Sequence, residues 1–253
     1  MAGNGKRGGP QHIPRPDSVR PGAPAPWSSL ADPAQLIDVA RLRTVFGGRA
    51  GEASPVAAEG GSASAVLVPI YPDDQDRLHV VLTRRATTLR THQGEVSFPG
   101  GRAEPGEDPV TTALREASEE VTLDPNDVEP IGELDHLSTV TRRAYIVPVI
   151  AVLRGKPELV PSEAEVAAVL HVPLAELLSG EVYREERWGS PPEDRGLHFF
   201  ELHGDTVWGA TAAMLRHFLV LSLGLDPGPR INWDPAGGSS VWMPPPGYED
   251  RVV

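Results

Sequence analysis

The sequence predicts an α+β domain in which helices sandwich a mixed β-sheet. Several short runs rich in Val, Ile and Leu have the length of strands, and only a few segments place apolar residues at helical spacing. Mixed strands with few helices favour the α+β class. The chain has 253 residues, 40% of them hydrophobic, which is enough for one domain of ordinary size with its own core.

Both ends of the chain differ in composition from the middle. Residues 1–30 are dominated by Pro and Gly and contain no apolar run of the signal-peptide kind, so we expect a disordered leader. Pro and Gly return after Leu225, which predicts an extended tail over 226–253. The single domain is therefore expected to span 31–225.

The first helix is expected to begin at Asp32, because apolar residues follow at helical spacing as far as Val45. Gly47 and Gly48 are expected to end it, and 49–64 is predicted to be a flexible connection. Apolar runs bounded by turn residues then predict the strands. These runs are 65–70, 78–83, 131–135, 145–153, 165–172 and 198–203. A short helix is expected over 174–178 and a closing helix over 209–223.

A further helix follows Asp108, which is a good N-cap, and Pro109 suits the first helical position. Two faces are predicted for it. The apolar stripe consists of Leu114, Ala117 and Val121, and the opposite, acidic face consists of Glu116, Glu119 and Glu120.

Three carboxylates so close together repel one another, at roughly 0.2–0.5 kcal/mol for a like-charged pair on an exposed helix. Arg115 is the one cation that the sequence places within a turn of them. A hard divalent cation such as Mg²⁺ would offset the repulsion between the carboxylates, because it binds carboxylate and carbonyl oxygens. A solvated acidic face is the alternative.

The full spacing resembles the signature of Nudix hydrolases, which cleave nucleoside diphosphates linked to another group. Its positions are Gly101, then five residues, Glu107, then seven residues, Arg115-Glu116-Ala117, Glu119-Glu120 and Thr122-Leu123. One position departs, since the family usually has glycine where this chain has Thr122. A β-branched residue in the left-handed conformation costs roughly 1–2 kcal/mol, so either the helix ends differently or strain is tolerated.

The residues before this box resemble a second signature, that of the coenzyme A diphosphatase branch of the Nudix family. The matching residues are Leu82, Thr83, Arg85, Leu89, Arg90, Gly94, Val96, Phe98, Pro99, Gly100 and Gly101. The resemblance implies the family's α/β/α sandwich and cleavage of coenzyme A, or of its acyl or oxidised forms. The products would be adenosine 3',5'-bisphosphate and 4'-phosphopantetheine or its acyl form.

The resemblance also implies a site for Mg²⁺ or Mn²⁺. Glu119 and Glu120 are the first-choice metal ligands, and a carbonyl at Gly100 would complete the shell. Glu116 is either a bridging ligand or the base that takes a proton from water. Glu165 matches the position of the family's additional ligand or base, with an exposed structural glutamate as the alternative.

Basic residues near the box are candidates for phosphate binding. Arg85 and Arg90 carry forked donors that suit phosphate oxygens, although either arginine could instead pair with a carboxylate. His92 is a weak candidate for the same role. Glu107 and Arg115 are expected to form an ion pair that supports the loop against the helix.

Composition excludes some classes of function. The chain has no cysteine, so thiolate metal sites and a cysteine nucleophile are excluded. Its net charge of −12 argues against nucleic-acid and membrane partners. We expect a cytoplasmic enzyme with a small-molecule substrate, with a homodimer as one possible assembly. Two alternatives stay open: a Nudix hydrolase of another substrate, such as ADP-ribose or a nucleoside triphosphate, and a non-catalytic Nudix-like binding module.

Overall fold

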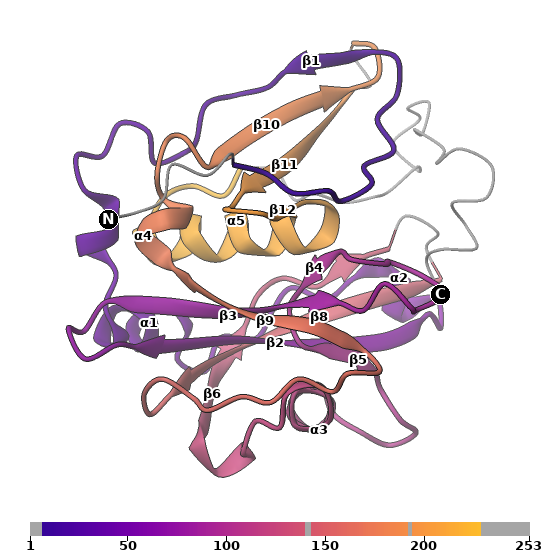
Figure 1. Ribbon diagram of the computed structural model, residues 1–253, viewed down its shortest axis with the longest axis vertical. Helices are drawn as coiled ribbons and strands as arrows, with labels where there is room; N and C mark the ends of the chain where they lie inside the picture. Colours follow the sequence, from indigo (N-terminus) through magenta and orange to yellow (C-terminus); the bar gives the residue numbers. More distant parts are fainter. Residues whose placement is uncertain (1–6, 140–142, 192–193, 229–253) are drawn as a thin grey trace.

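The computed structural model describes residues 7–139, 143–191 and 194–228, which form two β-sheets and several helices (Figure 1). The strands are β1 Val19–Pro21, β2 Ser62–Pro72, β3 Leu78–Arg85, β4 Val96–Ser97, β5 Gly100–Arg102, β6 Val128–Glu133, β7 Leu137–Ser138, β8 Ala144–Leu153, β9 Val166–Pro173, β10 Tyr183–Trp188, β11 Arg195–Glu201 and β12 Thr206–Val207. The α-helices are α1 Val39–Phe46, α2 Pro55–Ala58, α3 Pro109–Val121, α4 Leu174–Leu177 and α5 Gly209–Leu223, with short 3-10 helices η1 Pro33–Leu36 and η2 Pro125–Asp127.

A mixed eight-stranded sheet forms the centre of the molecule. Its main path runs β4-β3-β2-β8-β6, with β5 also paired to β2, β7 to β8 and β9 to β3. Strands β2 and β8 are parallel, from Ser62 opposite Ala144 to Ile70 opposite Val152, and the other named pairs in this sheet are antiparallel. The expected α+β class with a mixed sheet is confirmed.

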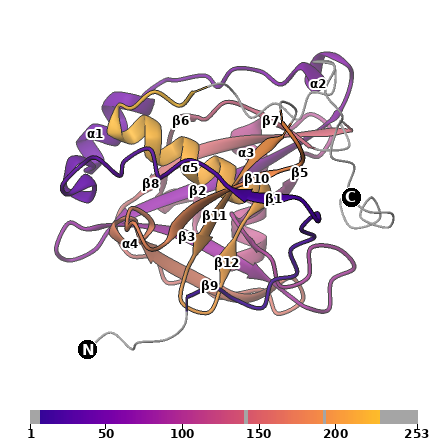
Figure 2. The same ribbon diagram turned by 90° about the horizontal axis from the view of Figure 1, so that it is seen from above.

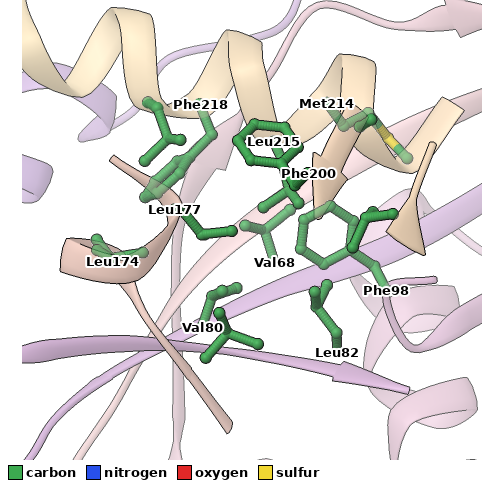
Figure 3. Packing of buried hydrophobic residues seen from close by; sticks show 14 of the residues in the cluster. Val68, Val80, Leu82, Phe98, Leu174, Leu177, Phe200, Met214, Leu215 and Phe218 are labelled. Carbon is green, nitrogen blue, oxygen red and sulfur yellow. The ribbon is translucent and has the colours of Figure 1, made fainter. Parts of the chain in front are cut away.

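Side chains alternate between two apolar layers along the central strands. In β2, Leu67 belongs to the layer that α3 covers, whereas Val68 and Ile70 belong to the layer that α5 covers. In β3 the same alternation places Val80 on the α5 side and Val81 on the α3 side. Figure 3 shows how the α5 side is filled by side chains from the sheet, from α4 and from α5 itself. A strand buried on both faces carries a nearly continuous apolar run, which is why these strands were predictable.

Helices cover both faces of the central sheet, as the expected sandwich requires. Helix α3 lies on one face, and α5 lies on the other beside α1 (Figures 1 and 2). Helix α5 has the predicted bounds and ends at Gly224, which adopts a left-handed conformation with φ 72°. Trp208 and Met214 are buried in the core.

A second sheet, which the sequence did not predict as a unit, lies on the far side of α5 from the central sheet (Figure 1). It is antiparallel in the order β1-β10-β11-β12. The expected strand 198–203 lies partly within β11, which begins three residues earlier and ends at Glu201. The architecture is therefore an α/β/α sandwich with an additional sheet over α5.

The expectation of a disordered leader is wrong for residues 7–30. Strand β1 pairs with β10, from Val19 opposite Trp188 to Pro21 opposite Glu186. Trp27 is buried, and its indole Nε1 donates a hydrogen bond to the carbonyl of Leu178 at 3.0 Å. A strand that ends in proline can form here because β1 is at the edge of its sheet.

Two further expectations need correction. The helix expected from Asp32 is divided into η1 and α1, and Asp38 caps the second part by accepting a hydrogen bond from the Arg41 amide at 2.6 Å. The predicted flexible connection 49–64 contains α2 and the first residues of β2. The segments 131–135 and 165–172 overlap β6 and β9.

Residues 229–253 of the expected tail lie outside the described residues. Among the helices that the structure describes, none combines the length and the apolar character needed to cross a bilayer.

Candidate active site

Helix α3 carries most of the predicted site, and its ends explain its position. The Asp108 side chain accepts a hydrogen bond from the Thr111 amide at 2.9 Å, and Pro109 occupies the first turn. At the other end, Thr122 adopts the left-handed conformation with φ 57° and ψ 32°. Its hydroxyl donates to the carbonyl of Val160 at 3.1 Å. Strain is thus tolerated where the Nudix signature has glycine.

The three glutamates of α3 do not all lie on the face opposite its apolar stripe, contrary to the prediction. Ala113, Ala117 and Val121 pack into the core, while Leu114 is only partly buried. This orientation turns Glu120 inward, with 3% of the residue exposed, and leaves 60% of the Glu119 side chain exposed. The simple helical wheel missed the difference because the sheet and the loop 159–165 contact α3 from two sides.

Glu120 is held against the backbone of β5. The Gly100 amide donates a hydrogen bond to Glu120 Oε2 at 3.2 Å. Gly100 has φ +151°, and a Cβ there would lie 2.4 Å from the carbonyl oxygen of Ala65 on β2. Only glycine permits both the backbone conformation and this close approach.

Gly101 leaves room for Glu116. A Cβ on Gly101 would lie 2.5 Å from Glu116 Oε2. The two glycines therefore place bare backbone directly beside two carboxylates of α3.

Arg115 connects the loop before α3 to the helix. Its guanidinium donates to Glu107 at 2.8 and 3.1 Å, to Glu116 at 3.0 Å and to Glu119 at 3.1 Å. It also donates to the carbonyl of Arg102 at 3.1 Å. The hydrogen bonds from Arg115, followed by those from the Glu104 amide and Thr112, lower the pKa of Glu107 to about 2. The ion pair expected between Glu107 and Arg115 is present.

Arg85, at the end of β3, approaches one carboxylate of α3, that of Glu120. Its Nη1 lies 3.9 Å from Glu120 Oε1. Its Nε is buried and has no hydrogen-bond partner in the described part of the chain. The neighbouring Arg84 points to the opposite face, where it donates to both carboxylate oxygens of Asp205 at 2.7 and 2.6 Å.

Arg90 and His92 lie in the loop after β3, away from these contacts. Arg90 is exposed and, among the residues described, forms no hydrogen bond or ion pair. The imidazole Nδ1 of His92 lies 2.7 Å from Glu95 Oε2, within the same loop. The structure therefore brings Arg85, but not Arg90, close to Glu120 of α3.

Glu165 is brought to the site by backbone hydrogen bonds. Its carbonyl accepts from the Ala86 amide at 2.8 Å, and the Ser162 amide donates to the carbonyl of Glu120 at 2.8 Å. The exposed Glu165 side chain lies close enough for its charge to act on Glu116 and Glu120. Residues far apart in sequence thus share one acidic site.

The environment disfavours the charged forms of the two inner carboxylates. Burial raises the pKa of Glu116, although Arg115 acts in the opposite direction. Burial raises the pKa of Glu120 to about 7, and the hydrogen bond from Gly100 and the charge of Arg85 offset this only in part. Negative charge here is therefore incompletely balanced by the protein itself.

The donor chemistry fits a hard divalent cation. Carboxylate oxygens and the Gly100 carbonyl are ligands of the kind that Mg²⁺ and Mn²⁺ take. Within residues 7–139, 143–191 and 194–228, however, no three acidic or histidine side chains already converge on one point. Glu119 and Glu116 are turned toward Arg115, and Glu120 toward the Gly100 amide. Holding an ion would require these side chains to rotate.

Sequence reasoning missed the contacts on the other face of β3. Asp205 is buried and pairs with Arg84, and Gln11 donates to the same Asp205 carboxylate at 2.8 Å. Strand alternation alone would have separated Arg84 from Arg85. No sequence pattern indicated which residues Arg84 would meet.

Comparison with known proteins shows similarity to one family. The model of the NUDIX domain matches residues 61–192, slightly more than half of the chain. An uncharacterized Nudix hydrolase, NudL of Photorhabdus laumondii, is 36% identical over 155 residues, which are 60% of this chain and 81% of the relative.

Longer relatives match over part of their length. Nudix hydrolase 22 (chloroplastic) of Arabidopsis thaliana is 40% identical over 160 residues, 60% of this chain and 52% of the relative. The chain thus spans about half the length of that plant protein. The Nudix domain of NrtR from Shewanella oneidensis, solved in complex with ADP-ribose, is 24% identical, with a TM-score of 0.38 over 49% of this chain and 80% of that one.

Proposed function

The chain belongs to the Nudix family, and from this premise we propose that it hydrolyses the diphosphate of coenzyme A or of its acyl or oxidised derivatives. The products would be adenosine 3',5'-bisphosphate and 4'-phosphopantetheine, or its acyl form. The observation that carries the proposal is the approach of Arg85 to Glu120. This contact brings an arginine of the coenzyme A signature beside a carboxylate of the Nudix box.

Nudix hydrolases generally use divalent metal ions. In this chain Glu116, Glu119, Glu120 and the carbonyl of Gly100 would hold Mg²⁺ or Mn²⁺. The ion, when bound, would neutralise phosphate charge and lower the pKa of a water molecule.

The protein's own residues supply binding and proton transfer. Arg85 and Arg90 bind phosphate oxygens, and the buried Nε of Arg85 is a donor for which the described chain offers no partner. Coenzyme A has a diphosphate and a ribose 3'-phosphate, so two separate cationic contacts suit it. Either Glu116 or Glu165 takes the proton from the attacking water. The ion pair between Glu107 and Arg115 holds the loop before α3 against the helix.

Identification of products tests the substrate. The full chain is incubated with coenzyme A and Mg²⁺ or Mn²⁺, and we expect masses of the two proposed products. Dephospho-coenzyme A should be a markedly poorer substrate if Arg90 or Arg85 recognises the 3'-phosphate. Preferred hydrolysis of ADP-ribose or a nucleoside triphosphate would reassign the substrate. Absence of metal-stimulated hydrolysis across all of these would indicate a binding module.

Substitution of the carboxylates tests the site. Glu119→Gln and Glu120→Gln should each lower kcat by about 100-fold or more, the scale seen when one charge-stabilising group is removed. Glu163→Gln is the matched control, because Glu163 is an exposed glutamate close to Glu165 and outside the proposed site. Circular dichroism checks that each variant folds. Unchanged turnover in either α3 variant would refute the metal assignment.

We further propose that the enzyme is cytoplasmic. Whether it acts as a monomer or a homodimer is decided by its mass in solution, measured by light scattering.

A further inference from the structure

An N-terminal segment outside the Nudix match packs against the end of the second sheet. The Gly8 amide donates to the carbonyl of Leu202 at 2.8 Å, and the Gly9 amide donates to Thr206 Oγ1 at 3.0 Å. A Cβ on Gly9 would lie 2.6 Å from Asp205 Cα, so the backbones approach as closely as glycine allows. Residues 7–11 are termed the N-terminal clasp.

Gln11 ends the clasp, and its side-chain amide makes three hydrogen bonds. Its Nε2 donates to Asp205 Oδ1 at 2.8 Å and to the carbonyl of Gly94 at 3.0 Å. Its Oε1 accepts from the Thr206 amide at 2.8 Å. Both donor hydrogens and the acceptor are therefore used, which fixes the orientation of the side chain.

The Gly94 contact reaches the loop that carries Arg90. Residues 86–95 are termed the substrate loop. Its other hydrogen bonds are internal or near its base, such as Glu95 to His92 and Gln93 to Leu89. Among the residues that the structure describes, the bond from Gln11 is the only hydrogen bond that joins 87–94 to a segment outside the loop.

The anchor for this contact is a buried carboxylate that other residues also bind. Asp205 is 2% exposed, and both its oxygens are bound by Arg84 at the end of β3. Gln11 therefore links the substrate loop to the ion pair that the buried Asp205 forms with Arg84, between the second sheet and the central sheet. A loop held in this way samples fewer conformations before a ligand binds, so it loses less conformational entropy on binding.

We propose that the N-terminal clasp positions the substrate loop, with Gln11 as the positioning residue through which it acts on Arg90. The inference rests on the proposed function, because it takes Arg90 to be a phosphate contact. Loss of the clasp should weaken substrate binding while the carboxylates of α3, on the other face of the sheet, keep their geometry.

The test uses the full chain with Gln11→Ala and Gln11→Glu. The second variant keeps the size of the side chain and places a carboxylate against Asp205. We expect KM for coenzyme A to rise by about threefold to tenfold, the factor that one net hydrogen bond represents, with kcat within about twofold. Gln11→Glu should have the larger effect. His12→Ala is the control, since His12 is exposed and makes no hydrogen bond or ion pair with any described residue.

Hydrogen exchange provides a readout that needs no substrate. Amides of 87–95 should exchange faster in both Gln11 variants, whereas those of α3 should be unchanged. Unaltered loop exchange, or a fall in kcat at constant KM, would overturn the proposal. If coenzyme A is not hydrolysed at all, the proposed function fails, and exchange in the substrate loop still decides whether the clasp holds it.

Discussion

Thr122 stands where the Nudix signature has glycine, and its hydroxyl explains why it can stay there. The left-handed conformation costs roughly 1–2 kcal/mol for a residue with a Cβ. The hydrogen bond to Val160 returns about 1 kcal/mol. It also ties the end of α3 to the segment that leads to Glu165.

Thr122→Val keeps the shape and removes this hydrogen bond. We expect the free energy of unfolding to fall by about 1 kcal/mol, measured by urea denaturation. Thr88→Val is the control, because Thr88 is an exposed threonine with no hydrogen bond to the described chain. Equal stability of Thr122→Val and the wild type would show that the hydroxyl contributes nothing.

His198 is a buried imidazole that should make stability depend on pH. Burial, followed by the charges of Arg216 and Arg187, lowers its pKa to about 3. Its Nδ1 lies 2.8 Å from the Tyr183 hydroxyl, and Glu185 Oε2 lies 3.9 Å from the same nitrogen.

Protonation of His198 favours the unfolded chain, whose imidazole has a pKa of about 6.5. The contribution of neutral His198 to the free energy of unfolding is therefore fully present above about pH 6.5. It declines toward pH 3 by about 1.4 kcal/mol per pH unit. Between pH 7 and 5 the wild type should lose about 2 kcal/mol more than His198→Gln in urea denaturation. Parallel pH profiles for the two proteins would contradict the assignment.

At the scale of elements, β3 and the second sheet are joined by the ion pair between Arg84 and Asp205. Asp205→Asn leaves Arg84 with a neutral partner, and we expect a loss of about 2 kcal/mol in unfolding free energy. This is less than the 3–5 kcal/mol of a fully buried pair, because the Arg84 side chain keeps 36% of its surface exposed. Asp74→Asn, at an exposed turn, should change stability little. A loss no larger than that of this control would show that the pair does not join the layers.

Some elements could be predicted because local and tertiary signals agree. Helix α5 is apolar around most of its surface and ends at a glycine, so its bounds follow from sequence. Helix α3 begins at an N-cap aspartate followed by proline. In both helices, residues that favour a helix terminus on local grounds lie at the terminus that the structure shows.

Other elements were hidden because their residues are stabilised by partners far away in sequence. Strand β10 reads Tyr-Arg-Glu-Glu-Arg-Trp, and its charges are paired across the sheet, for example Arg184 with Glu201 at 2.6 Å. In the site, the composition of the donors was predictable. The burial of Glu120 and the pairing of Arg84 and Arg85 with different carboxylates were not predictable, because they depend on how α3 and β3 pack against the rest of the fold.

At the scale of the whole molecule, residues 7–30 are part of the folded unit. Trp27 stacks on Phe200 with ring centroids 6.4 Å apart and lies 5.1 Å from the Tyr183 ring. Removing a large buried aromatic side chain lowers the free energy of unfolding by roughly 3–5 kcal/mol.

Trp27→Ala should therefore lower the unfolding free energy by about 3–5 kcal/mol, measured by urea denaturation. Leu36→Ala, at a residue that is 53% exposed, is the control and should cost less than about 1 kcal/mol. If the two variants are equally stable, the N-terminal segment contributes little to the folded state.

Adjacent guanidinium groups at the end of β3 serve opposite sides of the sheet. Which carboxylate each arginine contacts depends on the face of the sheet toward which its side chain points, and this alternates from one residue of the strand to the next. Deleting one residue upstream, between Leu78 and Thr83, would exchange the two assignments if the strand ends stayed fixed. The chain would keep its charge, but Arg84 would face away from Asp205 and Arg85 away from Glu120, so single-residue insertions and deletions in this strand should be far more damaging than arginine-to-lysine replacements.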